Sequence, residues 1–273
     1  AGFGRDFEQF EEALQRPQSQ LTGDLRKLPE IPILNSFSFR RAAEMYANLC
    51  KVHLLTGDPD AALKDLRMMR RLMDAVLANE PPFLMDAMIK VAMAGLYART
   101  LEETLAAELW PPSLLERVQK LGDGTDVLSN VSRSLREGER AVMTQYFRSL
   151  VEGPGWQAVF SGQAKTNRAQ IIERLYLKLL MPHGWLDQNC ATYARLFQIH
   201  LEGLDFAGQR LDARAIEAGD HRLSKEFEVD HFRPFYSMAA IAIPNVVSAY
   251  QTSARNQTLL DQTYLACALE RCR

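Results

Sequence analysis

The chain has 273 residues, of which 47% are hydrophobic and 24% charged, which is ordinary for a packed globular protein and long enough for a sizeable core. Its formal net charge of −2 argues against a protein that coats nucleic acid, because such proteins normally carry a basic excess. No run of about 20 apolar residues occurs, so the sequence predicts no membrane-spanning segment. Four cysteines are too few for a disulfide-stapled scaffold, and whether Cys50 and Cys190 pair stays open.

Apolar residues recur at helical spacing along most of the chain, and a sustained period of two is absent. This pattern predicts an all-α fold, either an irregular multi-helix bundle or a short helical-hairpin solenoid, as a single domain over residues 1–273. If the domain subdivides, the glycine-rich loop 152–167 separates residues 1–151 from 168–273. In chain order, helices are expected over 5–16, 36–56, 59–76, 83–108, 113–121, 125–151, 168–180, 184–204 and 234–273. An extended connector is expected at 17–33 and a mixture of helix and loop at 205–230. The last helix is expected to bend at Pro244.

The expected turn between the second and third helices has a clear local signature. Gly57 suits the left-handed position after a helix, Asp58 can cap the next helix, and Pro59 fits its first position. The resulting hairpin resembles a single tetratricopeptide repeat, although no second copy follows at the 34-residue period of that repeat. Basic residues on its second helix, Arg67, Arg70 and Arg71, are interpreted as a solvated face.

The segment from Phe83 to Met93 is apolar on nearly all sides, which predicts an enclosed central helix. Asp86 and Lys90 interrupt it, so both are expected at an edge of the core or paired with another group. An apolar helix of this kind also supports an alternative function, the carriage of an apolar small ligand. Further along, Ser113 and Glu116 have the spacing of a capping box.

Candidate catalytic carboxylates lie in the segment around Gly138, a residue that costs a helix interior about 1 kcal/mol and suggests close approach of another backbone. Glu137 and Glu139 could act as a general acid, with Asp187 or Asp230 as the second carboxylate at roughly 5 to 10 Å that glycan hydrolysis requires. The alternative interpretation is a helix crossing held by ion pairs, in which Arg140 takes part.

A second cluster follows a predicted helix start near Gly184, where free backbone N–H groups favour polar or anionic ligands. Candidate ligand- or partner-binding residues here are Trp185, Gln188, Asn189 and Arg195. The alternative is structural, with Asp187 or Asn189 capping the helix and Trp185 anchoring it in the core.

No metal site and no cofactor are predicted. The five histidines never fall three or four residues apart, so no helical pair of metal ligands exists. His221 and His231 lie in the one acidic, imidazole-containing stretch, but their spacing matches no known ligand pattern. Phosphate-binding glycine loops, nucleophile elbows and zinc-protease motifs are also absent from the sequence.

Several short motifs resemble an uncharacterised family of bacterial membrane-anchored, extracytoplasmic all-helical proteins. They are Leu135-Arg136-Glu137-Gly138-Glu139-Arg140-Ala141, Trp185-Leu186-Asp187-Gln188-Asn189, Phe83-Leu84 after a Glu-Pro junction, and the terminal Ala268-Leu269-Glu270-Arg271-Cys272-Arg273. The resemblance covers most of the chain and implies a periplasmic helical domain, tethered in the full-length protein by an anchor upstream of Ala1 and continuing past Arg273. It implies no chemistry.

Together these observations favour a non-catalytic helical interaction or scaffold module of the bacterial cell envelope. Its partner would be another protein or an envelope component, it would not bind nucleic acid, and it would meet the membrane only through the anchor. The alternatives are a hydrolase that uses paired carboxylates on an envelope glycan or polymer, and the apolar-ligand carrier. Whether the chain is an enzyme stays open at this stage.

Overall fold

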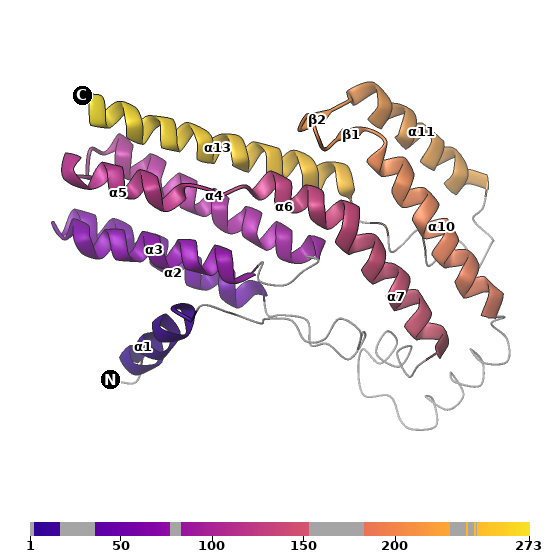
Figure 1. The fold of residues 1–273 in the computed structure, drawn as a ribbon, viewed down its shortest axis with the longest axis horizontal. Helices are drawn as coiled ribbons and strands as arrows, with labels where there is room; N and C mark the ends of the chain where they lie inside the picture. The colour runs from indigo at the N-terminus through magenta and orange to yellow at the C-terminus, as the bar shows by residue number, and fades with distance from the viewer. Residues whose placement is uncertain are drawn as a thin grey trace. The chain divides into compact units, whose positions relative to one another are not determined.

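The computed structural model describes residues 3–16, 36–76, 83–152, 183–229, 239, 243 and 245–273, and these residues are almost entirely helical (Figure 1). The all-α expectation is confirmed. The connector 17–33, the loop 153–167, the helix 168–180 and Asp230 fall outside the described residues. Among those described, no helix is both long and apolar enough to cross a membrane.

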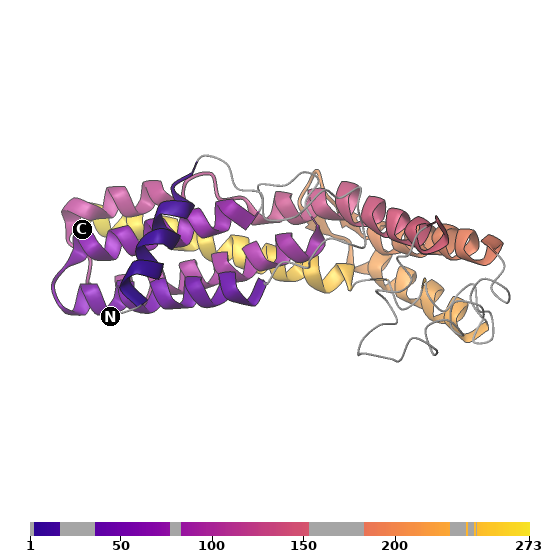
Figure 2. The ribbon, with the colours of Figure 1, turned by 90° about the horizontal axis from the view of Figure 1, so that it is seen from below.

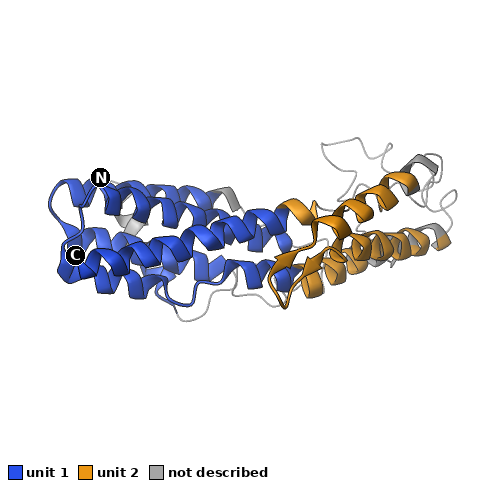
Figure 3. Cartoon of the chain, turned by 90° about the horizontal axis from the view of Figure 1, so that it is seen from above, with its two compact units in different colours: residues 1–21, 33–134, 249–273 blue, residues 22–32, 135–248 orange. Residues whose placement is uncertain are grey.

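The chain divides into two compact units (Figure 3). Unit 1 takes residues from 1–21, 33–134 and 249–273, and unit 2 takes residues from 22–32 and 135–248. Most of the loop 152–167, where the sequence places a possible subdivision, lies outside the described residues, and the division between the two units falls at Ser134 and Ser248. It falls there because residues 249–273 return to pack with the first half of the chain.

Unit 1 is a bundle in which α2, α3 and α4 pack against one another, α5 packs on α3, and α6 packs on α4. A further helix, α1, lies outside this bundle against α3 (Figures 1 and 2). The helices of the unit are α1 (Phe3–Leu14), α2 (Ser36–Leu55), α3 (Pro59–Val76), α4 (Leu84–Ala106), α5 (Pro112–Gly122), α6 (Val127–Arg133) and most of α13 (Val246–Cys272).

The α2–α3 turn has the local chemistry that the sequence predicts. Gly57 has a φ of +80°, in the left-handed region that glycine adopts without strain. The Asp58 carboxylate accepts the backbone N–H of Ala61 at 3.1 Å, and Pro59 is the first helical residue. Short-range sequence signals therefore fix the point at which the hairpin reverses.

The long apolar helix α4 packs against α2, α3 and α6. Leu84, Ala87, Val91 and Met93 are buried, as expected, whereas Met85 is 46% exposed. One edge of this helix therefore reaches the surface, so its first turn is not enclosed on every side.

One predicted helix start is wrong for a reason of local stereochemistry. Helix α5 begins at Pro112, one residue before Ser113, so Ser113 lies inside the helix and forms no capping box with Glu116. The described part of α13 begins at Val246, after Pro244, and Asn245 accepts the backbone N–H of Ser248 at 3.0 Å. The predicted helix start at Pro234 and the predicted bend at Pro244 fall outside the described residues.

Helix α13 packs closely on α5 in unit 1. Gly122 is buried, and a Cβ added to it would overlap the ring of Tyr264. The close approach of the Tyr264 ring therefore requires a glycine at this position. The sequence of α5 alone does not reveal that requirement.

Unit 2 is built on the antiparallel pair α7 (Glu139–Glu152) and α10 (His183–Leu201) (Figure 1). The Tyr193 ring lies 5.9 Å from that of Phe147 and 5.6 Å from that of Phe197, between centroids. A two-stranded antiparallel hairpin of β1 (Leu204–Asp205) and β2 (Arg210–Leu211) follows, and then α11 (Ala213–Val229), which packs on α10. The sequence predicts no strand here, because each strand has two residues and is too short for an alternating apolar and polar pattern to show.

The helix predicted over 125–151 is present, but it contains a π-helical turn, η2 (Ser134–Gly138), between α6 and α7. A π-turn accommodates one residue more than an α-helix would. Gly138 lies within it and is buried.

Candidate functional site

A group of ionisable side chains lies where α2 meets α3. Tyr46, Cys50 and His53 are spaced by four and three residues, so they share one face of α2, and Asp65 lies opposite on α3. Tyr46, Cys50 and Asp65 are buried, and His53 is half-buried. Burial raises the pKa of both Tyr46 and Cys50, and the Asp65 carboxylate adds to each shift. We call this group the hairpin seam.

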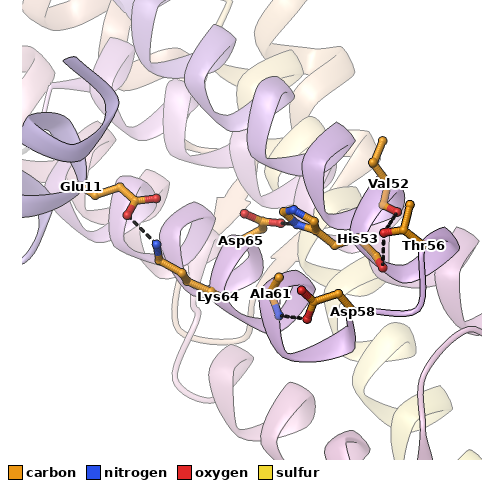
Figure 4. Close-up of polar contacts among 8 residues, drawn as sticks. All are labelled: Glu11, Val52, His53, Thr56, Asp58, Ala61, Lys64 and Asp65. Carbon is orange, nitrogen blue, oxygen red and sulfur yellow. Dashed lines mark hydrogen bonds and ion pairs between the residues drawn. The ribbon is translucent and has the colours of Figure 1, made fainter. Parts of the chain in front are cut away.

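The centre of the seam is a hydrogen bond between the His53 ring and Asp65, with 2.6 Å between Nδ1 and Oδ2 (Figure 4). Burial raises the pKa of the Asp65 carboxyl, and the hydrogen bond from His53 partly opposes that effect. A carboxylate that accepts from Nδ1 fixes the ring orientation and leaves Nε2 as the second polar atom of the imidazole. Because His53 and Asp65 lie on either side of the Gly57 turn, the bond also clamps the two helices of the hairpin together.

The rest of the seam supplies no activated nucleophile. Burial raises the pKa of the Cys50 thiol to about 12, and Asp65 contributes in the same direction. Burial likewise raises the pKa of the Tyr46 hydroxyl. A thiol or phenol held in its protonated form is a poor nucleophile. The seam therefore presents an oriented imidazole without the partner that nucleophilic catalysis requires.

Metal binding finds little support in the same place. His53 and Asp65 could each donate one ligand, but a structural or catalytic site needs at least three protein ligands. Across the residues that the structure describes, no three His, Cys, Asp or Glu side chains come together in this way. His221 is exposed on α11, and His231 lies outside those residues.

Helix α1 lies over the hairpin seam. Its Glu11 carboxylate accepts a hydrogen bond from Lys64 Nζ of α3 at 2.6 Å (Figure 4). The Glu11 side chain is only 17% exposed, whereas that of Lys64 is 58% exposed. Burial is the main cause of the raised pKa of Tyr46 and of Asp65, and the Glu11 charge adds to both shifts. We call the surface of α2 and α3 that faces α1, marked by Tyr46, Lys64 and Asp65, the hairpin face.

A second buried acid occupies the first turn of α4. Asp86 is 2% exposed, and neither of its carboxylate oxygens has a hydrogen-bond partner among the described residues. Burial raises its pKa to about 6. Lys90, one turn later, is also buried, and burial lowers the pKa of its ammonium group. The prediction that these two residues lie at an edge or find a partner is therefore wrong for Asp86.

The arginines of α3 are not uniformly solvated. Arg70 is half-buried, and its Nη1 donates to the backbone carbonyls of Gly122 and Asp123, each at 3.3 Å, and to the hydroxyl of Thr125. A cation at the carboxyl end of a helix satisfies carbonyls that have no partner within that helix. Arg70 is thus a structural residue that fixes the end of α5 on α3.

The acids predicted around the π-turn lie in unit 2 at its surface. Glu137 and Arg140 are exposed, and Glu139 is half-buried. Burial raises the pKa of Tyr193, and the Glu139 charge adds to that shift. The Arg136 guanidinium lies over the ring of Phe206, 5.9 Å from its centroid, a cation–π contact. This part of the helix is therefore anchored next to the chain that follows α10.

The residues predicted near Gly184 lie on α10, which begins at His183. Asp187 and Gln188 are exposed within the helix, so neither acts as a cap. Asn189 is fully buried, and its Oδ1 accepts the backbone N–H of Ala239 at 3.0 Å, so this residue joins α10 to a later segment instead of capping the helix. Arg195 is exposed, and the Trp185 side chain lies outside the described part of the chain.

The structure does not bring Glu137 and Asp187 together. Asp187 is 14 residues before the end of α10, which corresponds to about 21 Å along the helix axis. Glu137 lies near the opposite end, because its neighbour Arg136 contacts Phe206 beyond that end. A glycosidase needs its two carboxylates within roughly 5 to 10 Å. The other predicted partner, Asp230, lies outside the described residues.

The sequence contains one signal for the hairpin seam. Asp65 falls among the apolar residues Ala62, Leu66 and Met69, on the face that α3 buries. A carboxylate in such a stripe needs a hydrogen-bonding partner, and His53 is the nearest imidazole across the turn. A search for metal-ligand spacing within single helices cannot detect a pair that joins two helices.

Comparisons with known proteins give no further guide to the site. A scan against protein-family models, a search of curated proteins and a search of solved structures found no match.

Proposed function

We propose that this chain is a non-catalytic helical interaction module of the bacterial cell envelope, and that the hairpin face is its docking surface. The observation that carries the proposal is α1, which packs on α3 from outside the bundle through the Lys64–Glu11 ion pair. A surface that accepts one amphipathic helix from its own chain has the shape and charge to accept a helix from a partner.

The chemistry of the described ionisable groups also favours binding over catalysis. The Cys50 thiol of the hairpin seam is held protonated by burial, and the His53 imidazole is committed through Nδ1 to a helix–helix clamp. The exposed acids Glu137 and Asp187 lie at opposite ends of α10, so they do not support the hydrolase alternative. The envelope location rests on the resemblance of the sequence motifs to periplasmic helical proteins.

The alternative of an apolar-ligand carrier gains no specific support. The side chains expected to line its cavity, among them Leu84, Ala87 and Val91, belong to the core that α4 forms with α2, α3 and α6. Such packing supplies the stability that a rigid docking surface requires.

Affinity capture tests the proposal, with purified, tagged protein used on envelope extract at near-physiological salt. We expect a specific partner to be enriched by the wild-type protein and at least fivefold depleted with Lys64→Glu, which reverses the charge at the centre of the hairpin face. Lys225→Glu is the matched control, because Lys225 is an exposed lysine on α11 of unit 2. Recovery of no partner above background, or equal recovery by all three proteins, would overturn the proposal.

A further inference from the structure

We infer that α1 is an intramolecular competitor for the hairpin face, and that the partner of this surface is an acidic amphipathic helix of another protein. The inference rests on the proposed function, because it names the class of partner and the means by which its access is controlled.

The sequence and burial of α1 define what the hairpin face accepts. Phe10, Glu11 and Leu14 fall on one side of the helix and are half-buried, whereas the intervening Glu12 and Ala13 are exposed. The buried side therefore combines an aromatic ring, a carboxylate and a leucine within about one turn. The sequence of α1 as a whole is acidic, with Asp6, Glu8, Glu11 and Glu12 against the single Arg5.

The receiving surface has the complementary charge. Lys64, Arg67 and Arg71 recur at three- and four-residue spacing, so they form a basic stripe along one side of α3. Lys64 is the member that pairs with Glu11, and Arg67 and Arg71 are half-buried on the following turns. Opposite charges on the two helices guide their association and disfavour a basic partner.

The contact is also of a kind that a competitor can displace. Among the side chains described for α1, from Gln9 to Leu14, none is fully buried, and the ion pair has an exposed lysine. Exposed pairs contribute little to binding energy, about 1 kcal/mol or less. A separate helix that presents the same aromatic–carboxylate–leucine pattern can therefore replace α1 at modest cost.

The test uses a fluorescent peptide with the sequence of residues 3–16 as the surrogate partner, titrated into the 273-residue protein by fluorescence anisotropy. Four proteins are compared, namely wild type, Glu11→Lys, Lys64→Glu and the charge-swapped double variant. Circular dichroism confirms that each is folded, and a peptide with Phe10 and Leu14 both replaced by Ser is the negative control.

We expect the Glu11→Lys protein to bind the peptide roughly fivefold more tightly than wild type, because its own α1 no longer pairs with Lys64. Lys64→Glu should bind it less tightly than Glu11→Lys does, because the receiving charge is reversed. In the double variant α1 regains an ion pair of opposite polarity, so the affinity for the peptide should be lower than that of Glu11→Lys. Equal affinity for all four proteins, or binding of the Ser-substituted peptide, would overturn the inference.

Failure of this inference and failure of the proposed function give different results. If wild type and Glu11→Lys capture the same envelope partner in equal amounts, the chain is an interaction module without control by α1. If neither captures a partner, the proposed function fails whatever the peptide does.

Discussion

Replacement of Asp86 by Asn should stabilise the protein at neutral and alkaline pH. The Asp86 carboxyl is buried at the start of α4, has no hydrogen-bond partner among the described residues, and has its pKa raised from 3.8 to about 6. The folded protein therefore holds this proton more tightly than the unfolded chain does. The contribution of this carboxyl to the free energy of unfolding is therefore greatest below about pH 4 and is lost as the pH rises through 6.

The size of the effect follows from the same pKa values. A rise from 3.8 to about 6 corresponds to about 3 kcal/mol of lost stability once the carboxyl is ionised, at 1.36 kcal/mol for each pH unit. Asn has nearly the same shape and never ionises. The free energy of unfolding of Asp86→Asn should therefore match that of wild type at pH 4 and exceed it by about 1 to 3 kcal/mol at pH 8.

Urea denaturation followed by far-UV circular dichroism at the two pH values measures this difference. Glu102→Gln is the matched control, because Glu102 is an exposed acid on the same helix. We expect no pH-dependent gain from this control. If Asp86→Asn changes stability equally at pH 4 and pH 8, ionisation of a buried carboxyl is not what limits stability here, and the reasoning fails.

Three further variants test other contacts by the same denaturation assay. His53→Ala should lower the free energy of unfolding by about 1 to 3 kcal/mol, and by more at pH 8 than at pH 5, because it leaves Asp65 buried without its partner. An equal loss at both pH values would contradict this. Gly122→Ala should cost about 2 kcal/mol, since the new methyl group overlaps the Tyr264 ring, and an additional Tyr264→Ala substitution should recover part of that loss. Asn189→Ala removes a buried hydrogen bond and should lower the free energy of unfolding by about 1 to 3 kcal/mol. Gln188→Ala, at an exposed position on the same helix, should be close to neutral. Equal effects of the two variants would show that the bond to Ala239 contributes little.

Local signals predicted the parts of this fold that depend on neighbouring residues alone. The prediction of the Gly57-Asp58-Pro59 turn is correct because a left-handed glycine, a capping carboxylate and an N-terminal proline act within a few residues of one another. The start of α5 was wrong because two signals competed, and Pro112 at the first helical position prevailed over the Ser113 cap.

Features that depend on tertiary contacts could not be predicted in this way. The burial of Asp86 is set by the helices around α4, and its own sequence pattern indicates only that a charge interrupts an apolar face. The His53–Asp65 pair joins two helices, so no spacing within either one reveals it. Asparagine is a residue type that often caps helices, yet the hydrogen-bond partner of Asn189 is 50 residues away along the chain.

The π-turn at Ser134–Gly138 has a consequence for how the length of the protein can vary. Because such a turn holds one surplus residue, removal of a single amino acid there can restore ordinary helical geometry without rotating either flank. The same deletion in the middle of α4 or α10 would turn every later side chain by about 100° and expose the core face. Single-residue length differences among orthologues should therefore collect at this turn and be excluded from the regular helices on either side.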